Sequence, residues 1–371
     1  MLHSLGFILS SLSWCASAQQ SGAPIDRHAT RETVNLLKNL KSLQKEGVMF
    51  GHQDALAYGY DWKYQQGRSD VKETSGQFPA VYGYDLGHLE TGSAINLDSV
   101  PFDKMRDYIL AAFNQGAVVT LSWHLNNPLG GSSWDVKNGT VASILPGGSN
   151  HKMFNQWLDR LAVFMNSLKT PKGVAIPVLF RPYHELSGNW FWWGESVSTP
   201  EEFKKLWKYT VSYLQNKKVH NLLYVFNTDK FKSKEHYLER YPGDQWVDML
   251  SFDTYQFNDP RKDSGFYNMV KRQLDDITSI AKEHHKPVAF SETGYEGIPF
   301  ENWWTETLWP LIENYPISYV LVWRNAGLMP SGKYHYYAPY KGHASESDFK
   351  KFEALPRTLF QEDVQKKNLY N

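Results

Sequence analysis

Eight short runs of apolar, β-branched and aromatic residues recur along the chain, with helix-like spacing of apolar positions between them. The run over residues 117–121 is almost continuously apolar, which is typical of a parallel strand buried on both faces. The predicted strands are residues 48–53, 80–85, 117–124, 176–185, 222–228, 249–255, 288–293 and 319–325. This strand–helix alternation predicts an α/β fold, a single (β/α)8 or TIM barrel.

The intervening segments carry helix signals. Thr199 and Glu202 form a capping box, with Pro200 at the first helical position. Helical periodicity also covers residues 31–45, 151–168 and 267–284. Since no Pro/Gly/Ser-rich linker divides the chain, we expect one catalytic domain over residues 19–371.

Polar residues end every predicted strand, and barrel enzymes gather their catalytic groups at that end. Two of these strands end in Glu185 and Glu292, each followed by tryptophans. Cleavage of a glycosidic bond needs two carboxyl groups, one to protonate the leaving oxygen and one to attack the sugar or activate water. Aromatic rings can hold the apolar faces of sugar rings. The pattern therefore predicts a polysaccharide-cleaving enzyme.

Strand alternation places further groups near these glutamates. Arg181, Tyr183 and Glu185 should share a face, where the arginine would keep a carboxylate ionised. A structural ion pair is the alternative for Arg181. Tyr255 shares a face with Asp253, and its hydroxyl could donate to Glu292; core packing is the alternative.

Four histidines, His52, His88, His124 and His184, raise the question of a metal site. The first strand offers only one histidine, whereas metal-binding barrels place two at alternating positions. We therefore expect no metal and no cofactor, and interpret the histidines as hydrogen-bond partners for sugar hydroxyls.

Tryptophans serve cores as well as sugar sites. Trp157 and Trp207 lie on helical patterns and are expected in the core. Trp134 follows a glycine–serine loop and is a candidate for sugar stacking. Trp323 ends the last strand beside Arg324, where we favour a role in the site.

Composition and the amino terminus narrow the ligand and the compartment. A net charge of +0 with 15% aromatic residues favours an uncharged polyhydroxylated ligand over nucleic acid. An apolar stretch before Ala16-Ser17-Ala18 predicts an export signal over residues 1–18, and the mature chain should reach the periplasm or the medium. No membrane span is expected. Lipid anchoring through Cys15 is the alternative, although Trp14 stands where such signals require a small residue.

Six phrases resemble those of β-mannanases in glycoside hydrolase family 26, within clan A of the retaining glycosidases. They are Phe50-Gly51-His52-Gln53, Ser122-Trp123-His124-Leu125-Asn126-Asn127-Pro128, Arg181-Pro182-Tyr183-His184-Glu185-Leu186-Ser187-Gly188, Ser251-Phe252-Asp253-Thr254-Tyr255, Ser291-Glu292-Thr293-Gly294 and Trp323-Arg324-Asn325-Ala326. They span nearly all of the mature chain in order.

The resemblance implies that Glu185 is the acid/base and Glu292 the nucleophile, with His184 orienting the acid/base. It implies double displacement at β-1,4 bonds of β-mannan or manno-oligosaccharides, with Arg324 binding the sugar further toward the non-reducing end; we expect a monomer. The residues expected to bind substrate are His124, Trp123, Trp134, His184, Trp190, Asp253, Tyr255, Trp323 and Arg324.

Two alternatives stay open. A β-1,3-xylanase or a mixed-linkage β-glucanase would use the same scaffold and both glutamates, because outer sugar contacts decide the substrate. A non-catalytic carbohydrate-binding protein would keep the fold without turnover.

Overall fold

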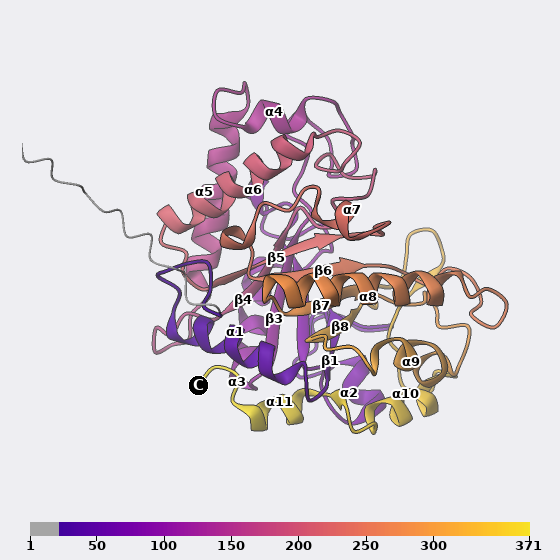
Figure 1. Ribbon diagram of the computed structural model, residues 1–371. Coiled ribbons are helices and arrows are strands. Elements are labelled where there is room, and N and C mark those ends of the chain that lie inside the picture. Colours follow the sequence, from indigo (N-terminus) through magenta and orange to yellow (C-terminus); the bar gives the residue numbers. More distant parts are fainter. Residues whose placement is uncertain (1–21) are drawn as a thin grey trace, which may run out of the picture.

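The computed structural model describes residues 22–371, and a closed barrel of eight parallel strands forms its centre (Figure 1). The strands are β1 (Val48–Gln53), β2 (Val81–Asp85), β3 (Val118–Trp123), β4 (Val178–Pro182), β5 (Leu222–Thr228), β6 (Met249–Asp253), β7 (Val288–Thr293) and β8 (Tyr319–Val322). Each strand pairs with the next, and β1 pairs with β8 to close the barrel. The predicted (β/α)8 barrel is confirmed.

Helices cover the outside of the barrel (Figure 1). They are α1 (Arg31–Leu43), α2 (Asp70–Ser75), α3 (Phe102–Asn114), α4 (Thr140–Ile144), α5 (His151–Ser167), α6 (Pro200–Asn216), α7 (Lys234–Leu238), α8 (Gly265–His284), α9 (Trp309–Ile312), α10 (Glu346–Glu353) and α11 (Gln361–Lys367). Two short 3-10 helices are η1 (Leu89–Thr91) and η2 (Asp244–Trp246), and η3 (Trp304–Leu308) is a π-helix. Three two-residue strands are β9 (Gly327–Leu328), β10 (Tyr334–His335) and β11 (Thr358–Leu359). The predicted capping box begins α6, since Glu202 N donates to Thr199 Oγ1 at 3.2 Å and Thr199 N donates to Glu202 Oε2 at 2.9 Å.

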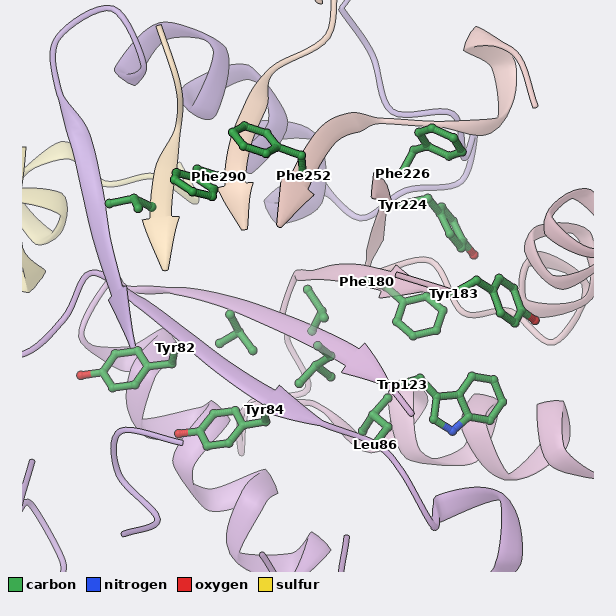
Figure 2. Close-up of a cluster of buried hydrophobic side chains, with 14 of the residues drawn as sticks. Tyr82, Tyr84, Leu86, Trp123, Phe180, Tyr183, Tyr224, Phe226, Phe252 and Phe290 are labelled. Atoms are coloured by element: carbon green, nitrogen blue, oxygen red, sulfur yellow. The ribbon is translucent and has the colours of Figure 1, made fainter. Parts of the chain in front are cut away.

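The main core lies between the strands and the surrounding helices. Alternate strand residues, among them Phe180, Phe226, Phe252 and Phe290, point outward into this layer (Figure 2). Phe252 and Phe290 stack with their ring centroids 4.5 Å apart. Trp207 on α6 is buried in the same layer, as its helical pattern predicts. One face of every strand is thereby committed to packing, which leaves the other face for the barrel interior.

The barrel interior changes from apolar to charged along the strands. Near their amino ends, Met49, Leu179, Leu223 and Met249 form a second apolar cluster with leucines of α1. Further along β4 the same face carries Arg181, which is buried. Burial of apolar groups below and of charges above fixes the site at the carboxyl end of the barrel, as barrel enzymes require.

The predicted leader over residues 1–18, with Cys15, lies outside the described residues. Within residues 22–371, every helix is too short or too polar to cross a membrane.

Candidate active site

Arg181 lies at the centre of the carboxyl end of the barrel and contacts two carboxylates. Its Nη1 donates to Asp253 Oδ2 at 2.6 Å, and its Nη2 donates to Glu292 Oε1. Asp253 also accepts from Ser291 Oγ at 2.7 Å and from Asn227 Nδ2 at 2.9 Å. One guanidinium thus fixes acidic groups from β6 and β7 in a single network.

The network also sets protonation states. Although burial opposes it, Asp253 and Glu292 raise the pKa of Arg181, so the guanidinium stays charged. Burial raises the pKa of Asp253, against the lowering effect of Arg181. Burial and the charge of Glu292 raise the pKa of Tyr255, whose hydroxyl donates to Glu292 Oε2 at 2.8 Å. The predicted hydrogen bond from Tyr255 to Glu292 is confirmed, and Glu292 accepts a donor on each oxygen.

Glu185 lies three residues beyond the end of β4 and is only partly buried. The backbone at Glu185 is left-handed, with φ of 52°, a conformation that costs about 1–3 kcal/mol for a residue with a side chain. Asn227 Oδ1 accepts from the backbone N–H of Glu185 at 2.6 Å and holds this turn. Trp190 Nε1 donates to Glu185 Oε2 at 2.7 Å, so the carboxyl group is oriented by its own loop.

The pKa of Glu185 is raised, whereas an ion pair with a cation lowers the pKa of a carboxylate. Burial raises its pKa well above the ordinary value, and the charges of Asp253, Glu292 and Asp229 add to the rise, while the Trp190 hydrogen bond lowers it. Oxygens of Glu185, Asp253 and Glu292 lie within 4.8 Å of one another. A protonated carboxyl beside an oriented carboxylate can act together as proton donor and nucleophile.

A histidine chain lines the wall next to β3 and β4. Asp85 Oδ2 contacts His124 Nδ1 at 2.7 Å, and His124 Nε2 contacts His184 Nε2 at 3.0 Å. Although burial opposes it, Asp85 raises the pKa of His124, whereas burial and then His124 lower the pKa of His184 well below its usual range. The shared proton therefore belongs to His124, which donates to a neutral His184 immediately before Glu185.

Arg324 follows β8 and is held by partners from two other loops. Its Nη2 pairs with Asp98 Oδ1 at 3.0 Å, and its Nη1 donates to the Tyr58 hydroxyl at 3.2 Å. Although burial opposes it, Tyr58 and Asp98 raise the pKa of Arg324. Tyr58 and Asp98 come from the loops after β1 and β2, so these two loops hold the side chain of Arg324, which follows β8.

The structure corrects the expectation for Trp123. Its side chain is 0% exposed, its Nε1 donates to Glu90 Oε2 at 3.1 Å, and it packs in the core layer (Figure 2). The next residue, His124, takes the cleft side because successive side chains of a strand alternate. Trp123 therefore supports the wall and does not contact a substrate.

The expectation that Tyr183 shares the face of Arg181 and Glu185 is also wrong. Tyr183 has φ of 52°, and its hydroxyl shares a hydrogen bond with Thr210 Oγ1 of α6 at 2.8 Å. The chain leaves the strand at Pro182, so alternation no longer applies. Of the aromatic residues after the two glutamates, those fully buried are Trp192, Trp193, Trp303 and Trp304.

The remaining predicted aromatic and histidine positions divide between cleft and interior. Trp134 is 51% exposed and stacks on His124 with ring centroids 5.2 Å apart, as a sugar platform requires. Trp323 is half-buried after β8, and its backbone N–H donates to Thr293 O at 3.2 Å. His52 is buried on the outer face of β1, which it shares with Phe50, and burial lowers its pKa to about 3, so it is a neutral group in the core layer. The interpretation of His52 as a partner for sugar hydroxyls is therefore wrong.

Two groups of side chains in residues 22–371 have the spacing of cation ligands. They are Glu185, Asp253 and Glu292, and Glu195, His236 and Glu239. In the first, Arg181 already lies between two of the carboxylates; in the second, Arg240 Nη1 pairs with Glu239 at 2.8 Å. Since a guanidinium serves as the counter-ion in both, we interpret neither as a metal centre.

Sequence reasoning missed the residues that position the site. Asp85 and Asn227 lie at the polar ends of predicted strands and Ser291 lies in one of the six phrases, but the sequence predicts no role for any of them. Tyr58 and Asp98, which hold Arg324, lie in loops with no motif. Strand-end polarity signalled the first three, whereas no local pattern signals the last two.

A family model described as Glycosyl hydrolase family 26 matches residues 25–306. The chain belongs to glycosyl hydrolase family 26. Its structure superposes with a TM-score of 0.88 on a GH26 β-mannanase from Bacteroides ovatus, at 47% identity over 92% of this chain and 98% of that one. The shared architecture extends the family match beyond residue 306 to nearly the whole described chain.

Curated relatives agree with this family assignment. A mannan endo-1,4-β-mannosidase of Bifidobacterium adolescentis is 36% identical over 357 residues, which cover 90% of this chain but 35% of that protein. The chain thus spans about a third of that relative's length. A mannan endo-1,4-β-mannosidase of Bacillus subtilis is 29% identical over 298 residues, with 74% of this chain and 73% of that protein covered.

Proposed function

We propose that this family 26 enzyme hydrolyses β-1,4-mannosidic bonds in mannans and manno-oligosaccharides with retention of configuration. The names of the Bifidobacterium and Bacillus relatives and of the Bacteroides ovatus structure support the substrate. The single observation that carries the mechanism is the spacing of carboxyl oxygens within 4.8 Å, because retaining enzymes separate their two carboxyls by about 5–5.5 Å and inverting ones by about 6.5–9.5 Å.

The two glutamates divide the work by their surroundings. Glu292, oriented by Arg181 and Tyr255, attacks the anomeric carbon and forms the covalent mannosyl–enzyme intermediate. Glu185, whose raised pKa keeps its proton near neutrality, donates that proton to the departing glycosidic oxygen. The resulting Glu185 carboxylate then takes a proton from water, which attacks the same carbon and releases Glu292.

The surrounding groups bind and orient the sugars. Trp134 offers an exposed ring, and His124, whose two ring nitrogens are paired with Asp85 and His184, stacks against that ring and holds it in place. Trp190 both orients Glu185 and presents a 39% exposed indole beside it. Arg324 would bind the sugar further toward the non-reducing end.

A chromatographic time course with mannohexaose, cellohexaose and xylohexaose tests the substrate. Early release of short manno-oligosaccharides from mannohexaose alone is expected. Cleavage of only a gluco- or xylo-substrate would overturn the mannan assignment, and no cleavage would favour a binding protein. Proton NMR of the first products tests the mechanism, since retention requires the β-anomer to appear before mutarotation.

We also propose export of a monomer. Purification from the producing cell should yield a chain that begins at Gln19, found outside the cytoplasm and of monomeric mass by light scattering. A full-length cytoplasmic chain would contradict the leader over residues 1–18, and a lipid on Cys15 would favour the anchored alternative.

A further inference from the structure

Phe257 is an aromatic side chain that the fold leaves almost uncovered. It is 75% exposed, the largest fraction among the large apolar residues in the described part of the chain that are exposed. A phenyl ring with so little packing contributes little to stability, since burial of apolar area is the source of that contribution. Its position on the surface decides what it can do.

The backbone places Phe257 on the side of the strand ends that carries the site residues Asp253 and Tyr255. Beyond the end of β6 the chain stays paired with β7, because Thr254 N donates to Glu292 O at 3.0 Å and Gln256 N to Gly294 O at 2.9 Å. Side chains of an extended chain alternate, so Phe257 takes the same face as Asp253 and Tyr255. Those two side chains contact Arg181 and Glu292 in the site, and Phe257 therefore lies about 7 Å further along the same side.

Residues of the neighbouring β5 loop hold this ring beside the acid/base loop. Lys230 Nζ lies 5.6 Å from the centroid of the Phe257 ring, in a cation–π arrangement. The backbone carbonyl of Lys230 accepts from Ser187 Oγ, two residues after Glu185, at 3.2 Å. Asp229 is 9% exposed, and its charge contributes to the raised pKa of Glu185.

The direction of the substrate follows from the acid. A general acid protonates the oxygen of the leaving group, so the leaving sugars must lie on the side of Glu185. Arg324 is held by loops after β1 and β2, whereas Phe257 and Lys230 follow β6 and β5, which lie across the barrel in strand order. A chain that runs from Arg324 past the glutamates therefore leaves the site at Phe257.

We propose that Phe257, with Lys230 over its ring, binds mannosyl units of the leaving-group portion of the substrate. The ring stacks on the apolar face of a mannosyl unit, and the Lys230 ammonium donates to its hydroxyls. This assignment rests on the proposed function and adds a specificity-determining site to it. A substrate without sugars on the leaving side gains nothing from this site.

The test compares two substrates in one variant. Phe257→Ala should lower kcat/KM for mannopentaose about tenfold, the loss of one stacking contact of about 1.4 kcal/mol. With 2,4-dinitrophenyl β-mannobioside, whose leaving group is no sugar, kcat/KM should stay within about twofold of wild type. Phe257→Trp should retain the pentaose activity because an indole also stacks.

Val163→Ala is the matched control, since Val163 is 70% exposed on α5, away from the strand ends. The Val163→Ala variant should leave kcat/KM for both substrates unchanged. An equal loss on both substrates in Phe257→Ala, or no loss on mannopentaose, would overturn the leaving-group assignment. Absence of wild-type activity on both substrates would instead overturn the proposed function itself.

Discussion

Glu185 and Glu292 are both glutamates near the carboxyl ends of β4 and β7, yet they differ in burial, in hydrogen-bond donors and in the charges around them. Glu292 is 3% exposed and accepts hydrogen bonds from Arg181 and Tyr255. Glu185 is partly exposed, accepts from the neutral Trp190 indole, and faces the charges of other carboxyls. The comparison shows that two identical side chains acquire a donor and a nucleophile role from their neighbours alone.

The backbone explains why the two environments could diverge. Glu292 lies inside β7 opposite Asp253 of β6, where the register of the sheet shifts, and its carboxylate is held by Arg181 and Tyr255. Glu185 lies beyond β4, in a left-handed turn held by Asn227. A carboxylate that must not move is built into the sheet, whereas the group that exchanges protons is on a loop.

The largest expected effect comes from removing the carboxylate of Glu292. Glu292→Ala should lower kcat on mannohexaose by about 10⁴-fold, because no covalent intermediate can form. Azide added with the dinitrophenyl mannobioside should restore turnover and give the α-azide, measured by NMR. Glu301→Ala, an exposed glutamate, is the control and should be silent. A β-azide, or residual polymer activity near wild type, would contradict the nucleophile role.

Removal of the loop carboxyl should give the complementary pattern. Glu185→Ala should lower mannohexaose hydrolysis by about 10³-fold, but much less the formation of the intermediate from the dinitrophenyl substrate, which needs no acid. Azide should now give the β-azide. Because burial raises the pKa of Glu185, its deprotonation should form the alkaline limb of the wild-type rate profile. Survival of that limb in the variant would refute the assignment.

The ion pair with Arg181 distinguishes Glu292 from Glu185, and loss of Arg181 should make the two carboxyl groups more alike. Arg181→Met leaves Asp253 and Glu292 buried without their counter-ion, which should destabilise the fold by about 3–5 kcal/mol in urea denaturation. The acidic limb of the rate profile should move to higher pH, because the two carboxylates then repel each other. Arg261→Met removes an exposed pair with Asp259 and should leave the urea midpoint almost unchanged. Equal losses of stability in the two variants would show that the buried ion pairs of Arg181 contribute no more than an exposed ion pair.

The apolar pattern was sufficient to predict the barrel because each strand is committed to packing on its outer face. The predicted and observed bounds of β1, β5 and β7 coincide. Strands predicted to end at Glu185 and Asn325 end earlier, at Pro182 and Val322. The error has one cause: site residues continue the strand-like pattern after the backbone has left the ladder.

The site was predictable from the chemistry of residues at the strand ends rather than from alternation, since Glu185 lies past the end of β4 and the register of β7 shifts between Phe290 and Thr293. Both glutamates and the hydrogen bond from Tyr255 follow from strand ends and spacing. Trp123 was assigned wrongly because a tryptophan suits a core as well as a sugar site, and the adjacent His124 takes the cleft. The link between His124 and Asp85 joins residues 39 apart, and no local pattern indicates such a contact.

A smaller effect tests the histidine chain on the Glu185 side. Asp85→Asn should cost about 1.5–3 kcal/mol of stability, the value of a hydrogen bond between charged groups. The raised pKa of His124 contributes stability below about pH 6.5 and loses it as pH rises through the folded value; the lowered pKa of Asp85 contributes above about pH 3.9 and loses it as pH falls.

The difference in unfolding free energy between wild type and Asp85→Asn should therefore be largest between about pH 4 and 6.5 and shrink on both sides. Urea denaturation at pH 5.5 and pH 9 measures it. A difference independent of pH would mean that the Asp85–His124 contact is a neutral hydrogen bond. His220→Asn, which removes another histidine–aspartate contact on the surface of the barrel, serves as control.

The smallest expected effect concerns α6 and tests whether this helix positions Glu185. Thr199→Ala removes the cap of α6 and should cost about 1 kcal/mol in urea denaturation. The same helix holds Tyr183, two residues before Glu185, through Thr210. Because lost caps fray only the first turn, Thr210 should stay in place and kcat on mannohexaose should not change. A lower kcat with an unchanged dinitrophenyl rate would instead show that α6 positions Glu185, and Thr210→Val would then reproduce it.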